Sequence, residues 1–177
     1  MKHKILLPTD FSANAAKAIK YALEIYKNEP CIFYLLNVFY VKSKDIESLI
    51  NNEKDSPDYK SSQQHSESKL NKLVKDFAFG EKGHPKHSFQ TISVFNDVLE
   101  AIKTTVEEKD IELIVMGTRG ETNSERSIYG SVAISVMEKI RNCPVIVVPQ
   151  VAKPKLPKEI VFPTSYKTQY KKRELNL

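Results

Sequence analysis

The residues best suited to chemistry are two glycines, a gap of nine residues, and a Gly-Ser pair that opens a helical pattern. They follow the apolar run 111–116, which is short, rich in β-branched residues and typical of a buried parallel strand. Gly117 and Gly120 come next, and Gly130 and Ser131 close the stretch. Glycines let a backbone approach a ligand and adopt positive φ. The N–H groups at a helix start donate to phosphate oxygens, so the stretch predicts a phosphate-binding loop.

Three side chains near this loop have two interpretations each. Arg119 is either a phosphate clamp or a solvated arginine, and Ser131 is a phosphate ligand, a helix cap, or both. Met116 suits either the core or the floor of a pocket. The insert 121–129 carries two carboxylates that would repel phosphate if they pointed inward, and Arg126 partly offsets them.

Alternating apolar and amphipathic segments must position these residues. Helical spacing separates successive apolar runs, which predicts parallel strands with right-handed crossovers. The sequence therefore predicts an α/β fold, a doubly wound five-stranded parallel sheet sandwiched by helices. The predicted strands are 4–7, 31–39, 87–94, 111–116 and 145–148, and the helices follow Ser12, surround 70–77, follow Asn96 or Asp97, and span 131–141. In such sheets a ligand binds at the carboxyl ends of the strands, where the connections reverse.

One segment has little periodicity. Residues 40–64 are polar, which argues against a packed element and indicates a mobile excursion, with a short helix around 46–50 as an option. Helical order is expected to return at Leu70.

The glycine spacing resembles the ATP-binding signature of universal stress proteins. Residues 5–12 resemble that family's first strand and loop, and residues 143–149 resemble its last strand. The resemblance covers roughly residues 1–151. It implies a Rossmann-like, adenine-nucleotide-binding fold with the sheet order 3-2-1-4-5.

The resemblance also implies a site. ATP would lie across the crevice between the first and fourth strands, with adenine near Thr9 and Val38 and triphosphate on the glycine loop. Asp10 would bind ribose or a phosphate-bound Mg²⁺, or would instead cap the following helix. The residues implied to bind nucleotide are Pro8, Thr9, Asp10, Val38, Met116, Gly117, Arg119, Gly120, Gly130, Ser131 and Val132.

The sequence contains no recognisable catalytic constellation. No Walker lysine follows a glycine loop, and the turn 8–12 lacks the glycines of an NAD-binding fingerprint. His84 and His87 have no third metal ligand nearby in sequence, so a surface loop is favoured over a metal site. The expected function is an ATP-binding regulatory module of the stress response, with at most slow hydrolysis. The alternative is a nucleotide-free protein-interaction module of the same fold, which the intact glycine motif disfavours.

The end of the chain differs from the rest. Residues 153–177 carry seven Lys or Arg and two Asp or Glu, and so account for the whole net charge of +5. A solvated linker is favoured over a nucleic-acid-binding tail. Residues 158–166 echo residues 4–11, which predicts a domain over 1–150 and, over 151–177, a linker plus the truncated start of a second repeat.

Composition and edges complete the expectations. A chain of 177 residues with 41% hydrophobic and 28% charged residues is ordinary for one soluble domain. It contains no membrane-length apolar run and no signal peptide, and Cys31 and Cys143 are expected to be reduced, so we expect a cytoplasmic protein. The strand 145–148 would be a poorly protected edge, and pairing with its copy in a second chain would form a homodimer, as the family resemblance also implies. The alternative is pseudo-dimerisation with the second repeat of a full-length tandem protein.

Overall fold

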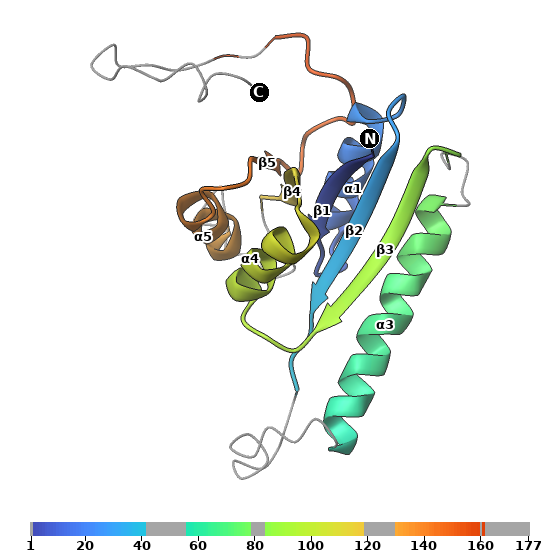
Figure 1. Ribbon diagram of the computed structural model, residues 1–177, viewed down its shortest axis with the longest axis vertical. Coiled ribbons are helices and arrows are strands. Elements are labelled where there is room, and N and C mark those ends of the chain that lie inside the picture. Colours follow the sequence, from blue (N-terminus) through green and yellow to red (C-terminus); the bar gives the residue numbers. More distant parts are fainter. Residues whose placement is uncertain (1, 42–55, 79–83, 119–129, 160, 162–177) are drawn as a thin grey trace.

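Five parallel strands form a single sheet in the order β3-β2-β1-β4-β5, as Figure 1 shows. The computed structural model describes residues 2–41, 56–78, 84–118, 130–159 and 161. The elements are β1 His3–Pro8, α1 Ala13–Ile25, β2 Cys31–Val38, α3 Pro57–Ala78, β3 His87–Val94, α4 Val98–Lys109, β4 Leu113–Gly117, α5 Ser131–Lys139 and β5 Val145–Val148. The predicted fold class and strand order are confirmed.

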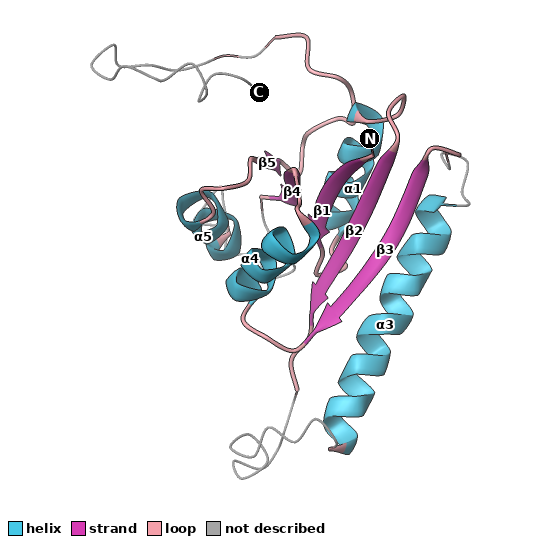
Figure 2. Ribbon diagram, viewed as in Figure 1, coloured by secondary structure: helices cyan, strands magenta, loops and turns pink. Residues whose placement is uncertain are grey.

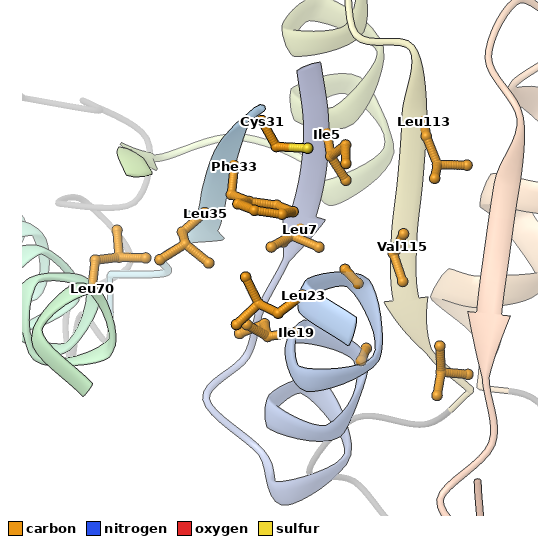
Figure 3. Close-up of a cluster of buried hydrophobic side chains, with 13 residues drawn as sticks. Ile5, Leu7, Ile19, Leu23, Cys31, Phe33, Leu35, Leu70, Leu113 and Val115 are labelled. Carbon is orange, nitrogen blue, oxygen red and sulfur yellow. The ribbon is translucent and has the colours of Figure 1, made fainter. Parts of the chain in front are cut away.

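Helices cover both faces of the sheet (Figure 2). Alternate residues of the buried strands point to opposite faces of the sheet. The side chains of each strand therefore contribute to two core clusters, one on each face. In β1, Ile5 and Leu7 pack towards α1 and α3, and Leu6 packs towards α4 and α5. Figure 3 shows the first cluster, in which Ile19 of α1 and Leu70 of α3 face the side chains of the sheet.

Polar side chains define where two of the helices begin. Ser12 is the N-cap of α1, and its hydroxyl accepts a hydrogen bond from the Ala15 N–H at 3.2 Å. Asp97, one of the two predicted candidates, is the N-cap of α4 and accepts from the N–H groups of Leu99 and Glu100. The sequence therefore located the starts of these helices correctly.

The helix α3 begins much earlier than predicted. The expectation that residues 40–64 lack a packed element is wrong for 57–64, which form the first turns of α3. The Ser56 hydroxyl accepts a hydrogen bond from the Tyr59 N–H at 3.2 Å, and Pro57 occupies the first turn, where its missing N–H costs nothing. Tyr59 also packs against the rings of Phe39 and Phe95. The optional helix at 46–50 lies outside the described residues.

The last described residues follow β5 without forming a helix or strand. Residues 153–159 are exposed, and the Val161 side chain is 85% exposed. The predicted start of a second repeat falls mainly on 160 and 162–177, outside the described residues, so it stays a prediction. Among the described helices, none is both long and apolar enough to cross a membrane.

Candidate functional site

The first and fourth strands separate towards their carboxyl ends. Pairing of β1 with β4 ends at Leu6 and Ile114, although β1 stays paired with β2 as far as Pro8 and β4 with β5 as far as Gly117. The connections also reverse between β1 and β4, because β1 leads to β2 on one side and β4 leads to β5 on the other. This is the position at which open α/β sheets bind ligands.

The loop after β1 forms one wall of this crevice, and Thr9 is its most firmly held residue. The Thr9 N–H donates to the Leu36 carbonyl at 2.8 Å, and the Thr9 carbonyl accepts from the Asn37 side-chain amide at 2.7 Å. Its hydroxyl accepts from the Phe11 N–H at 3.0 Å. Thr9 is only 7% exposed, so the internal hydrogen bonds of the protein fix its place at the end of β1.

Asp10 differs from Thr9 in being exposed. Its carboxylate accepts a hydrogen bond from the Ser12 N–H at 3.0 Å, an Asx turn that leads into α1. The cap position itself belongs to Ser12, so the capping alternative for Asp10 is not what the structure shows. The carboxylate therefore lies at the surface beside the carboxyl end of β1.

The opposite wall joins β4 to the start of α5. The Thr118 N–H donates to the Val148 carbonyl at 3.1 Å, and the Thr118 carbonyl accepts from the Gly130 N–H at 2.6 Å. The second bond brings the start of α5 next to the end of β4. Gly130 is the N-cap and has no side chain with which to cap, and Ser131 is the first helical residue rather than the cap.

Gly117 has a packing role that the sequence did not indicate. Among the described glycines none adopts positive φ, so neither Gly117 nor Gly130 needs glycine for that reason. A Cβ at Gly117 would lie 2.6 Å from Nδ2 of Asn14, whose side-chain amide donates to the Thr118 hydroxyl at 3.4 Å. Gly117 thus allows the first turn of α1 to pack directly on the end of β4.

Most of the predicted site residues converge on the crevice. They lie at the end of β1, at the ends of β2 and β4, and at the start of α5: Pro8, Thr9, Asp10, Val38, Met116, Gly117, Gly130, Ser131 and Val132. Met116 is buried in the core cluster beneath α4 and α5, which places its side chain in the core. Arg119 and Gly120 lie outside the described residues.

A chain of polar side chains behind Thr9 was not predicted from the sequence. Asn37 of β2, Ser66 of α3 and Ser93 of β3 are linked by hydrogen bonds of 2.7 Å. The only sequence signal was an amide within an otherwise apolar strand, which does not reveal its partners. Asn14 was missed for the same reason.

The two cysteine thiols lie in the core and are not activated. Burial raises the pKa of the Cys31 and Cys143 thiols to about 11, so both remain protonated at neutral pH and are poor nucleophiles. Both cysteines are free. Within the described ranges, no three His, Cys, Asp or Glu residues are grouped so as to hold a metal ion.

A separate groove of about 600 Å³ runs along the edge of the sheet at β3, between α3 and α4. Its lining includes Glu67, Ser93, Thr105 and Glu108. It contains none of the predicted site residues. The crevice is the better candidate for a binding site because the ends of β1 and β4 and the start of α5 converge there.

Comparison with known proteins identifies the family. The sequence model of the universal stress protein family matches residues 1–149 of this chain. The chain belongs to the universal stress protein family. It is 30% identical over 158 residues to universal stress protein MJ0577 of Methanocaldococcus jannaschii. The aligned region covers 84% of this chain and 95% of that protein.

Solved structures agree with this assignment. The structure of MJ0577 matches with a TM-score of 0.67 at 28% identity, covering 84% of this universal stress protein and 96% of the relative. A universal stress protein solved in complex with cAMP matches with a TM-score of 0.52 at 18% identity, covering 84% of this chain and 97% of the other. At that lower identity the likeness shows the shared fold alone.

Proposed function

We propose that this universal stress protein is a regulatory module of the stress response that binds ATP in the crevice between β1 and β4. The observation that carries the proposal is the Gly130 to Thr118 hydrogen bond, which holds the uncapped start of α5 beside the end of β4. The N–H groups of the first turn of a helix, with the helix dipole, favour an anion such as phosphate.

Each part of ATP has a proposed binding surface in the crevice. The triphosphate lies at the start of α5, near Gly130, Ser131 and Val132, of which the last two are exposed. The adenine lies towards the ends of β1 and β2, where Val38 offers partly buried apolar surface and the Thr9 backbone is fixed. The glycine loop, including Arg119 and Gly120, supplies the remaining phosphate contacts.

Asp10 fits a role with Mg²⁺. Its carboxylate is exposed at the carboxyl end of β1, and oxygen ligands are those that Mg²⁺ prefers when it bridges a protein and a nucleotide phosphate. The metal, when bound with ATP, neutralises part of the phosphate charge.

Family membership supports a nucleotide as the ligand. A universal stress protein of the same fold has been solved with cAMP, so the fold is one that can hold an adenine nucleotide. We infer that binding alters conformation or assembly rather than feeding fast turnover. The assembly is a homodimer in which the β5 edge, Val145–Val148, pairs with its copy.

Calorimetric titration of ATP with Mg²⁺ into nucleotide-free protein tests the proposal. We expect micromolar affinity in the natural protein and its loss in Gly130→Val, because the new side chain would occupy the place at which phosphate approaches the backbone. Glu138→Val adds the same side chain at an exposed position near the other end of α5 and should leave affinity unchanged.

The opposite result is equally informative. Folded, nucleotide-free protein that gives no heat at millimolar ATP would contradict ATP binding and favour a nucleotide-free interaction module. Equal affinity in Gly130→Val would move the phosphate site away from the start of α5.

A further inference from the structure

A chain of polar side chains connects the crevice to α3. The Asn37 amide donates to the Thr9 carbonyl at 2.7 Å and accepts from the Ser66 hydroxyl at 2.7 Å. The Ser66 hydroxyl also lies 2.7 Å from that of Ser93. Two strands, one helix and the loop after β1 thus share a single network that ends at the backbone of Thr9, where adenine is proposed to bind.

The network is placed where polar groups are costly. Asn37 is 6% exposed and Ser66 is 1% exposed. Buried polar groups destabilise a fold unless they are hydrogen-bonded, and serine is a poorer helix former than alanine. Ser66 and Leu70 are the two buried residues among those described in α3, so one of the two carries a hydroxyl. Core packing alone does not require that hydroxyl.

A second contact joins α3 to the same loop. The Lys69 ammonium lies 5.1 Å from the centre of the Phe11 ring, within the range of a cation–π interaction. Phe11 has a φ of 66°, a left-handed conformation that costs a bulky residue energy unless its surroundings hold it. Ser66 and Lys69 are three residues apart, so they lie on neighbouring parts of one helix face.

We propose that α3 is the positioning element of the nucleotide site, acting through Ser66 and Asn37 on Thr9 and through Lys69 on Phe11. The proposal rests on ATP binding in the crevice. Thr9 and Phe11 flank Asp10, so the two contacts hold the loop on both sides of Asp10, whose exposed carboxylate is proposed to bind Mg²⁺. Docking of α3 therefore favours nucleotide binding.

This coupling is reciprocal. If docked α3 raises the affinity for ATP, bound ATP must stabilise the docking of α3 by the same factor. The nucleotide then alters a helix beside β3 that carries none of the predicted site residues. The ligand-dependent change in conformation is thus assigned to α3.

The decisive variant is Ser66→Ala, studied by ATP titration and by site-resolved amide hydrogen exchange. Loss of the Ser66 hydroxyl removes its buried hydrogen bonds to Asn37 and Ser93, which predicts an affinity for ATP roughly three- to ten-fold weaker. The N–H groups of Phe11 and Ser12 should exchange faster, because the loop loses its support. Amides of α4, on the other face of the sheet, serve as the reference for global stability.

Matched variants separate positioning from stability. Ser68→Ala changes an exposed serine on the same helix and should leave affinity and loop exchange unchanged. Ser66→Thr keeps the hydroxyl and should restore both. Lys69→Met keeps the apolar stem but removes the charge, and should accelerate exchange at Phe11, whereas Lys72→Met at another exposed position should not.

The outcomes distinguish this inference from the proposed function. Absence of ATP binding by the natural protein contradicts the function, while loop exchange in Ser66→Ala still decides whether α3 supports the loop. Natural affinity and natural Phe11 exchange in both Ser66→Ala and Lys69→Met would overturn the positioning role of α3. Protection of α3 amides on addition of ATP would support it, and unchanged protection would contradict the coupling.

Discussion

Gly117 belongs to the predicted ligand-binding motif, and it is also needed for the packing of α1 against β4. A Cβ there would lie 2.6 Å from Nδ2, 3.0 Å from Cγ and 3.3 Å from the backbone carbon of Asn14. We expect Gly117→Ala to lower the free energy of unfolding by about 1–3 kcal/mol, the usual cost of overpacking a close contact. Denaturant unfolding measures the change.

A double-mutant cycle with Asn14→Ala tests the assigned cause. Removing the Asn14 amide relieves the two shortest contacts, so the second substitution should cost less in the presence of the first. Strict additivity of the two free-energy changes would show that Asn14 is not what excludes a side chain at Gly117.

The two buried cysteines predict a specific dependence on pH. Burial raises the pKa of the Cys31 and Cys143 thiols from 9.0 to about 11. The unfolded chain therefore releases these protons at lower pH than the native protein, so stability is fully present below pH 9 and falls as the pH rises towards 11. Chemical unfolding at pH values below and within this window should show the decline.

The control for this prediction is the double variant Cys31→Ala and Cys143→Ala. It keeps the Tyr26 phenol, whose pKa burial also raises, so it should show a shallower decline rather than none. An identical decline in the variant would assign the pH dependence to other groups.

For individual residues, the sequence predicted where they lie in the fold better than it predicted which contacts they make. The glycine spacing located the end of β4 and the start of α5 correctly. It could not show that Gly117 faces Asn14, or that Asn37 reaches Thr9, because both contacts join residues that are distant along the chain. Hydrogen-bond partners of buried amides depend on tertiary packing, which a single sequence does not report.

Among the elements, α3 departs furthest from its predicted form. Helices and strands with a clear apolar period were predicted within a few residues, because burial of one face imposes that period. The first turns of α3 are mostly exposed and have no such period. The signal that was overlooked is local: Ser56 followed by Pro57 and Asp58 is a typical helix start.

The first turns of α3 should depend on the ring of Tyr59. This ring lies 5.3 Å from that of Phe39 and 5.8 Å from that of Phe95. We expect Tyr59→Ala to speed amide exchange in the first turns of α3 and to lower stability by about 1–3 kcal/mol, through lost apolar burial and aromatic contacts. Exchange around Leu70, which is fully buried, should change less.

Tyr59→Phe is the matched control, because it keeps the ring and removes only the hydroxyl. It should behave like the natural protein. Equal acceleration in both variants would mean that the hydroxyl, and not the aromatic cluster, holds the start of the helix.

For the molecule as a whole, the order of the predicted elements indicated a parallel sheet, and the family resemblance indicated the strand order 3-2-1-4-5. The structure confirms both. The proposed homodimer would form through the β5 edge. The Ile114 and Thr118 N–H groups donate to the Pro144 and Val148 carbonyls, so even-numbered residues of β5 face β4. The backbone N–H of Val147 therefore points outward, towards the proposed partner.

This geometry allows the dimer to be tested without breaking the sheet. Val147→Pro removes an outward N–H while sparing the bonds to β4, and should convert a dimer to a monomer in sedimentation experiments. Val147→Ala loses more of the side chain but keeps the N–H, so it should remain dimeric.

On the opposite edge, β3 bonds to β2 through Lys86 and Val94, which leaves the Thr91 N–H facing outward as well. Thr91→Pro should therefore leave a β5 dimer intact, and loss of the dimer in that variant instead would place the interface at β3.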